Sequence, residues 1–156
     1  METKSWFNIE SKQASAGPIT FHDFARWADS RGRAYWSDLA PIGYTINGAT
    51  GGRLDLLYRA ESFQIERVTH GAFEGVPMHR HPAVDSFEFP LWGSGELWLG
   101  ARKFELDDKF TPWRGIYISR NTWHGGKGKD RGGAFLSVQS WHGPIIGSVI
   151  TSWESR

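Results

Sequence analysis

Residues 79–95 read HRHPAVDSFEFPLWGSG and bring two histidines, an aspartate and a glutamate close together in the chain. His79 and His81 are two residues apart, a spacing that places both side chains on the same face of a β-strand. Their Cα atoms would lie roughly 7 Å apart, because each strand residue advances the chain by about 3.3 Å. The two imidazoles can therefore bind one metal ion, and a carboxylate and a third imidazole from later strands would complete the site.

A third histidine, His124, follows a short apolar segment, Ile116-Tyr117-Ile118, and a turn. Together the two stretches resemble the motifs of the cupin superfamily, G-x5-H-x-H-x3-4-E-x6-G and G-x5-P-x-G-x2-H-x3-N. In the second motif Asn121 stands in place of a glycine, and asparagine tolerates a left-handed turn better than most side chains. The resemblance covers residues from about 63 to 142.

The identity of the carboxylate ligand is open between Glu88 and Asp85. Six residues separate His81 from Glu88 where the family has three or four, and Asp85 lies where the family's carboxylate is usually found. Glu88 is favoured, because six residues separate it from Gly95 as in the motif, and because it opens the apolar run 89–92. Asp85 would then belong to a lengthened loop at the mouth of the site.

The resemblance implies an all-β fold, the double-stranded β-helix (cupin or jelly-roll barrel), to which the sequence adds one short N-terminal helix. Residues 1–156 are expected to form a single cupin domain, with 1–33 as arm and helix and about 54–150 as the β-barrel. One divalent transition metal would be held by His79, His81, His124 and the carboxylate. Fe(II) is favoured, with Mn, Ni, Zn or Cu as alternatives.

From residue 34 onward the pattern is that of β-strands. Alternation of apolar and polar residues predicts strands at 54–58 and 62–68, and further strands are expected at 87–92, 96–100, 103–106, 116–118, 134–141 and 145–150. Gly93-Ser94-Gly95 is interpreted as a hairpin connection, and residues 125–133 as a flexible, charged loop. Nearer the start of the chain, Thr20 as N-cap and Gly32 as stop signal bound a predicted helix.

The composition limits the classes of partner. The chain has 18 basic and 17 acidic residues and a formal net charge of +1, which gives no electrostatic attraction to nucleic acid or to an anionic membrane. No apolar run reaches the 18 or so residues of a membrane-spanning helix. The N-terminus lacks the apolar core of a signal peptide, so a cytoplasmic location is expected. The absence of cysteine excludes disulfides and thiolate ligands.

The predicted function is that of a metal-dependent enzyme acting on a small organic acid or aromatic compound, by dioxygenase or lyase/isomerase chemistry. The alternative is a non-catalytic cupin that binds or senses a small molecule such as a sugar or acid. Gln139 and Tyr117 are candidates for catalytic contacts. Gln139 shares one strand face with Phe135 and Ser137 and is the polar residue expected to touch the substrate or metal-bound water, whereas Tyr117 is a candidate wall residue. A homodimer is expected, formed through the outer sheet or the N-terminal arm.

Overall fold

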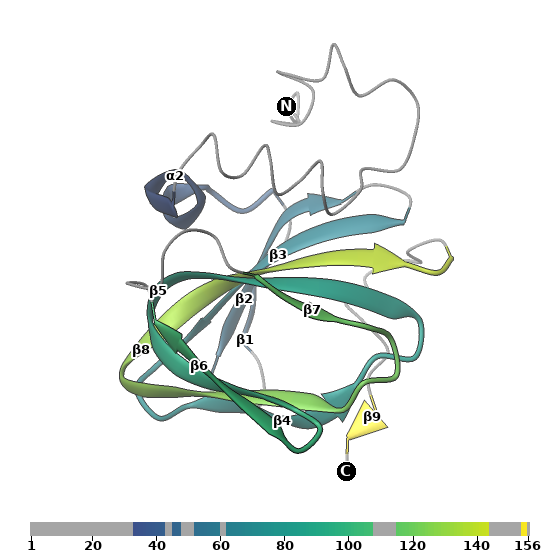
Figure 1. The fold of residues 1–156 in the computed structure, drawn as a ribbon. Helices are drawn as coiled ribbons and strands as arrows, with labels where there is room; N and C mark the ends of the chain where they lie inside the picture. The colour runs from purple at the N-terminus through teal and green to yellow at the C-terminus, as the bar shows by residue number, and fades with distance from the viewer. Residues whose placement is uncertain are drawn as a thin grey trace.

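The computed structural model describes residues 33–42, 45–47, 52–59, 62–107, 115–143 and 154–155. Its architecture is an antiparallel double-stranded β-helix with one short helix beside it, so the predicted fold class is confirmed (Figure 1). The elements in chain order are α2 (Arg33–Asp38), β1 (Thr45–Asn47), β2 (Arg53–Arg59), β3 (Phe63–His70), β4 (Gly75–Arg80), β5 (Val84–Leu99), β6 (Arg102–Asp107), β7 (Ile116–Ile118), β8 (His124–Trp141) and β9 (Glu154–Ser155). No helix in the described ranges is long and apolar enough to cross a bilayer.

Two long strands, β5 and β8, form the frame of the barrel. They pair with each other from Val84 opposite Trp141 to Leu99 opposite His124. The later half of β8 also pairs with β3, and its first residues pair with β4. Both long strands curl, as Figure 1 shows for β5, so the halves of each strand serve different walls of the barrel. This pairing brings the start of β8 beside the end of β4.

Two predicted connections are wrong, because both segments lie within continuous strands. Residues 93–95 continue β5 through two β-bulges, and residues 125–133 belong to β8. The glycines that suggested turns permit close approach of backbones instead. A Cβ at Gly93, whose φ is 89°, would lie 2.1 Å from the carbonyl oxygen of Gly132. A Cβ at Gly75 would lie 2.2 Å from that of Gly126.

The first part of the chain differs from expectation in one described segment. Residues 33–38 form the helix α2, although β-strand was expected from residue 34. Arg67 on β3 ties this helix to the sheet, because its guanidinium donates to the carbonyl oxygens of Ser37 and Leu39 at 2.6 and 2.9 Å. The same guanidinium pairs with the buried carboxylate of Asp55 at 2.7 Å. The predicted helix of residues 20–32 and the predicted strand 145–150 lie outside the described residues.

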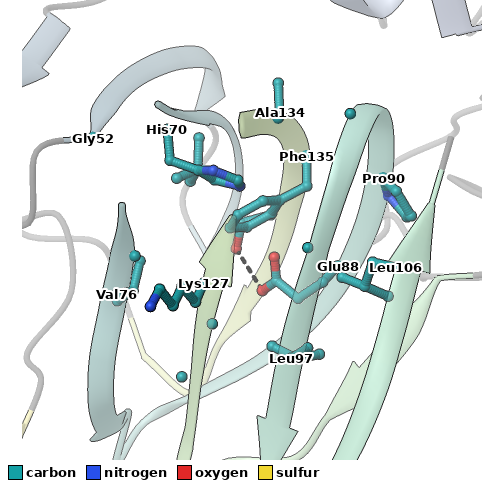
Figure 2. Close-up of a pocket in the computed structure, with 18 of the residues that line it drawn as sticks. Gly52, His70, Val76, Glu88, Pro90, Leu97, Leu106, Lys127, Ala134 and Phe135 are labelled. Carbon is teal, nitrogen blue, oxygen red and sulfur yellow. Dashed lines mark hydrogen bonds between the residues drawn. The ribbon is translucent and has the colours of Figure 1, made fainter. Parts of the chain in front are cut away.

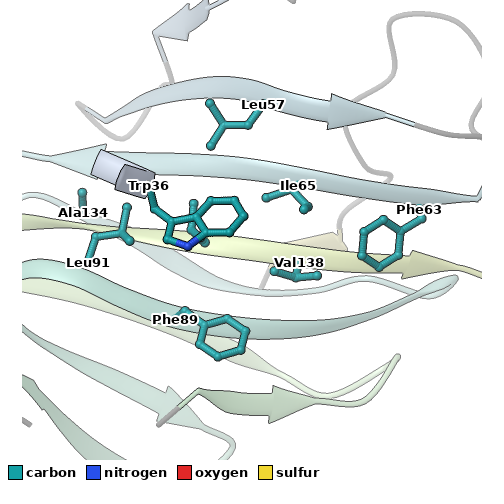
Figure 3. Packing of buried hydrophobic residues seen from close by; sticks show 9 residues of the cluster. Trp36, Leu57, Phe63, Ile65, Phe89, Leu91, Ala134 and Val138 are labelled. Carbon is teal, nitrogen blue, oxygen red and sulfur yellow. The ribbon is translucent and has the colours of Figure 1, made fainter. Parts of the chain in front are cut away.

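The hydrophobic core lies between the sheet and α2. Trp36 of α2 is fully buried, and it packs against alternate residues of β3, β5 and β8 (Figure 3). The members of this cluster are Trp36, Leu57, Phe63, Ile65, Phe89, Leu91, Ala134, Leu136 and Val138. Because side chains alternate along a strand, the residues between these members point to the opposite face of the sheet.

That opposite face, on the barrel interior, carries polar side chains. Glu66 on β3 lies opposite Ser137 on β8, and Ser137 in turn lies opposite Glu88 on β5. The neighbouring row is formed in the same way by Gln64, Gln139 and Ser86. All six side chains are buried. Over these two rows the strands therefore have an apolar face beneath α2 and a polar face directed into the barrel.

Candidate metal centre

A cavity of about 320 Å³ occupies the barrel and is lined by residues of β2, β3, β4, β5, β6 and β8. Figure 2 shows Glu88 pointing from β5 into this cavity, with Leu97, Leu106 and Phe135 around it. Three of the predicted ligands, His79, His81 and His124, also line it. The cavity therefore contains imidazole and carboxyl groups within a largely apolar wall.

The three histidines form one compact group. One ring nitrogen of each lies within 4.8 Å of those of the other two. The ring centroids of His79 and His124 are 4.2 Å apart, because these residues are direct partners in the β4–β8 ladder. His81 follows β4 immediately, and its ring lies 4.8 Å from that of His79 and 5.2 Å from that of His124. Strand pairing thus brings a histidine from the second motif to the two from the first.

Hydrogen bonds to backbone carbonyls orient two of these rings. Nδ1 of His79 lies 2.7 Å from the carbonyl oxygen of Pro77, and Nδ1 of His124 lies 2.8 Å from that of Thr122. A carbonyl oxygen only accepts, so each Nδ1 carries the proton and each Nε2 keeps a lone pair. This arrangement is typical of metal-binding histidines.

The protonation states also suit a metal. Burial, together with the neighbouring His124, lowers the pKa of His79 to about 4. Burial likewise lowers the pKa of His124. Both rings are therefore neutral at pH 7, which is the form that binds a metal ion.

The turn before His124 has the conformation that the sequence predicted. Asn121 has a φ of 63°, in the left-handed region, so it occupies the position of the motif's glycine. Its backbone N–H donates to the carbonyl oxygen of His81 at 2.9 Å. This hydrogen bond joins the turn that carries one histidine to the backbone of another.

Neither candidate carboxylate belongs to the histidine group within the described residues. Asp85 lies on the other face of β5 from Glu88, where it accepts from the backbone N–H of Arg120 at 2.8 Å and pairs with His142. Partial burial alone would raise the pKa of Asp85, but the hydrogen bonds from His142 and Arg120 outweigh it and lower that pKa. Glu88 lies in the same cavity as the histidines but accepts from the Ser137 hydroxyl at 3.0 Å.

The two candidate catalytic residues lie in different places. Gln139 lines the cavity, where its amide donates to Glu66 at 3.0 Å and accepts from the indole of Trp141 at 3.1 Å. The structure does not bring Tyr117 to the cavity lining. It lies opposite Phe87 in the β5–β7 ladder, on the face away from Glu88, and is 49% exposed.

Glu66 is a site residue that sequence reasoning missed. It is buried in the cavity wall, and burial, followed by the charge of Glu88, raises its pKa to about 8. Burial also raises the pKa of Glu88 to about 7. The signal was present in the alternation of β3, where Gln64 and Glu66 share one face. A polar face of a strand normally points to solvent, whereas here it points into the barrel.

No family model matches the chain, and no curated protein matches it. Solved structures do resemble it. KdgF from Halomonas sp. has a TM-score of 0.56 at 15% identity, over 63% of this chain and 87% of that one. The DMSP lyase DddQ from Ruegeria pomeroyi DSS-3 has a TM-score of 0.51 at 20% identity, over 65% of this chain and 50% of that one. The cupin domain of Schizosaccharomyces pombe Cnp3 has a TM-score of 0.53 at 16% identity, over 64% and 74%. At these identities the likeness is one of fold, and the chain has the fold of the cupin superfamily.

Proposed function

We propose that this protein is a metal-dependent enzyme that transforms a small organic acid in its barrel cavity by lyase or isomerase chemistry. One observation carries the proposal: three imidazoles, those of His79 and His124 buried and that of His81 half-buried, meet in the same cavity as Glu88, a buried carboxyl group with one oxygen that has no hydrogen-bond partner among the described residues. Metal ligands and a group that can exchange a proton are therefore available to one bound molecule.

The histidine group fits a divalent transition metal. His79, His81 and His124 would hold the ion through ring nitrogens, with Nδ1 of His79 and of His124 fixed by backbone carbonyls. When bound, such an ion polarises a carbonyl or carboxylate oxygen of the substrate through its open coordination positions. Imidazoles bind a metal ion in their neutral form, so three of them leave the charge of the ion uncompensated, which favours an anionic substrate group. This argument supports a small organic acid over a neutral compound.

Glu88 supplies the proton chemistry in this proposal. A carboxyl group with a pKa of about 7 accepts and releases protons readily near neutral pH. Its Oε1 is fixed by the Ser137 hydroxyl, while its Oε2 has no hydrogen-bond partner in the part of the chain that the structure describes. We assign to the Glu88 carboxylate the removal of a proton from a substrate carbon. In an isomerisation the proton returns to the substrate, and in an elimination it stays on Glu88 while the leaving group departs with its bonding electron pair. Gln139 and Ser137, which are hydrogen-bonded to each other, position the acidic groups.

The fold alone does not determine which reaction the site catalyses. One structural neighbour is described as a DMSP lyase and another only as a cupin domain, so the fold is compatible with lyase chemistry without requiring it. Iron(II) dioxygenation would use the same three histidines. The buried carboxyl groups in the cavity are the observation that favours proton transfer over oxygen chemistry.

The test is solvent exchange. The protein is loaded in turn with Fe(II), Mn(II), Ni(II), Zn(II) or Cu(II) and mixed in D₂O with a panel of small carboxylic acids. Proton NMR is expected to show deuterium entering a carbon next to a carboxyl or carbonyl group, and Glu88→Gln should abolish the exchange. An oxygen electrode runs in parallel. Oxygen uptake without exchange would replace this proposal with a dioxygenase, and a ligand-induced thermal shift without turnover would replace it with a binding protein.

A further inference from the structure

We propose that Glu66 and Glu88, here called the acid pair, form a second binding subsite in the cavity that takes a primary or secondary ammonium group. The inference deepens the proposed function and rests on it, since it assigns to the substrate an amino group in addition to its acidic group. The subsite is distinct from the histidine group, which contains neither glutamate.

The acid pair is built by strand register. Glu66 on β3 and Glu88 on β5 flank Ser137 on β8, so the three side chains form one row across neighbouring strands. All three line the cavity, and their exposed fractions are 3%, 8% and 6%. Two carboxyl groups are thus held almost completely out of bulk water, on a wall that a ligand in the cavity would touch.

Hydrogen bonding leaves one acceptor without a donor. The amide of Gln64 donates to Oε1 of Glu66, and the amide of Gln139 donates to Oε2. Ser137 donates to Oε1 of Glu88 and the Ser86 hydroxyl also interacts with this carboxyl group, but Oε2 of Glu88 is buried and has no hydrogen-bond partner among the described residues. A buried carboxylate oxygen without a donor is costly, and the cost is recovered when a ligand supplies the donor.

No described cation compensates the charge of Glu88. The positive charge of Arg59 favours the ionised form of Glu66, and its guanidinium donates a hydrogen bond to the neighbouring Gln64 at 2.6 Å. One member of the pair therefore has a nearby cation. Lys127 lines the cavity but is exposed and donates nothing to Oε2 of Glu88 (Figure 2). A ligand that satisfies this site must therefore donate a hydrogen bond and carry positive charge. An ammonium group does both, whereas an alcohol or a quaternary ammonium ion does only one.

The experiment uses metal-free full-length protein at about pH 8, where the acid pair is ionised to a greater extent than at neutral pH. Isothermal titration calorimetry compares n-butylammonium with 1-butanol and with tetramethylammonium. We expect n-butylammonium to bind with 1:1 stoichiometry and at least about tenfold tighter than either control, because a charge-assisted hydrogen bond is worth that factor or more. Equal affinity for n-butylammonium and 1-butanol would overturn the proposal without any variant.

Variants locate the subsite. Glu88→Gln keeps the shape of the side chain and is expected to reduce n-butylammonium affinity by about tenfold or more. Glu105→Gln is the matched control, because Glu105 lies on β6, is about half exposed and pairs with Lys103 and Lys129. The affinity of this variant for n-butylammonium should equal that of the wild type. Unchanged affinity in Glu88→Gln would overturn the assignment. Because Glu88→Gln removes a buried charge, it should fold, and circular dichroism checks this.

Removal of metal separates this inference from the proposed function. His79→Ala should lose metal binding and keep n-butylammonium binding, since His79 is not part of the acid pair. If the wild-type protein holds metal and exchanges substrate protons but ignores n-butylammonium, the subsite is wrong and the proposed function stands. If n-butylammonium binds but no acid undergoes exchange, the proposed function fails and the ammonium subsite remains.

Discussion

His79 and His124 lie directly opposite each other on the antiparallel strands β4 and β8, with their ring centroids 4.2 Å apart. The β4–β8 ladder thus sets the distance between two proposed ligands from separate motifs. The shared hydrogen-bond pattern, in which each Nδ1 donates to a carbonyl two residues earlier in the chain, directs both Nε2 atoms in a related way.

This relationship predicts that His79→Ala and His124→Ala each lower metal affinity by more than about a hundredfold, since loss of a group that merely orients a ligand already costs about 10–100-fold. Metal content after loading and dialysis, measured by mass spectrometry, checks the result. His142→Ala is the control, because His142 is exposed and pairs with Asp85 outside the histidine group. Full metal occupancy in both ligand variants would refute the site.

The carboxylate question is decided by a second pair of variants. Glu88→Gln and Asp85→Asn are both expected to retain metal, because neither side chain belongs to the histidine group. Asp85→Asn should instead weaken the contacts to Arg120 and His142. If Glu88→Gln alone loses metal, Glu88 serves as the fourth ligand, as the motif spacing suggested. The same metal analysis distinguishes these outcomes.

A third prediction concerns pH and Glu66. In the unfolded chain this carboxyl loses its proton near pH 4.5, whereas the folded protein retains it up to about pH 8. The folded state binds more protons between these values, so this group lowers the free energy of unfolding as pH rises through that window. Glu66→Gln removes the effect. Urea titrations measure the free energy of unfolding of both proteins. The value for the variant minus that for the wild type should increase by more than about 1 kcal/mol from pH 5 to pH 8, since one pKa unit corresponds to about 1.4 kcal/mol.

A constant difference between the two proteins across that range would contradict the buried state of Glu66. His70 and His79, whose pKa values are also shifted, are present in both proteins, so their contributions largely cancel in the difference. Glu88→Gln provides a second comparison, because burial raises the pKa of Glu88 as well.

Trp36 provides a test of the core that should leave the metal site intact. Trp36→Ala is expected to lower the free energy of unfolding by about 3–5 kcal/mol, the range for removing a fully buried aromatic side chain. Chemical denaturation measures the loss. Metal retention under native conditions should not change, because Trp36 packs on the apolar face of the sheet and not in the cavity. Loss of metal at temperatures where the variant is still folded would show that the two faces are coupled.

The histidine group could be predicted from sequence in two ways: local rules relate His79 to His81, and the resemblance to the cupin motifs adds His124, which β4–β8 pairing brings to them. Alternation puts His79 and His81 on one face, and the turn pattern anticipates the left-handed Asn121. Residues 125–133 resemble a loop in sequence, because they combine glycine with charged residues. Strand pairing with β4 and β5 orders them instead. Such pairing depends on distant segments, so no local pattern reveals it.

The positions of the acidic residues are harder to predict from sequence for a related reason. Motif spacing favours Glu88 over Asp85, and in the structure both lie outside the histidine group. Glu66 was overlooked because a strand with alternating polarity does not reveal which face is enclosed. Only closure of the barrel shows that the polar face of β3 is internal.

The core around Trp36 and the polar residues of the cavity lie on opposite faces of the same strands. This separation affects which substitutions the protein can accept. Substitutions in the cavity leave the packing around Trp36 in place, so their effect on the free energy of unfolding comes from buried polar and charged groups and not from lost core contacts. The residues that line the cavity can therefore be substituted, by natural selection or by design, without repacking the core.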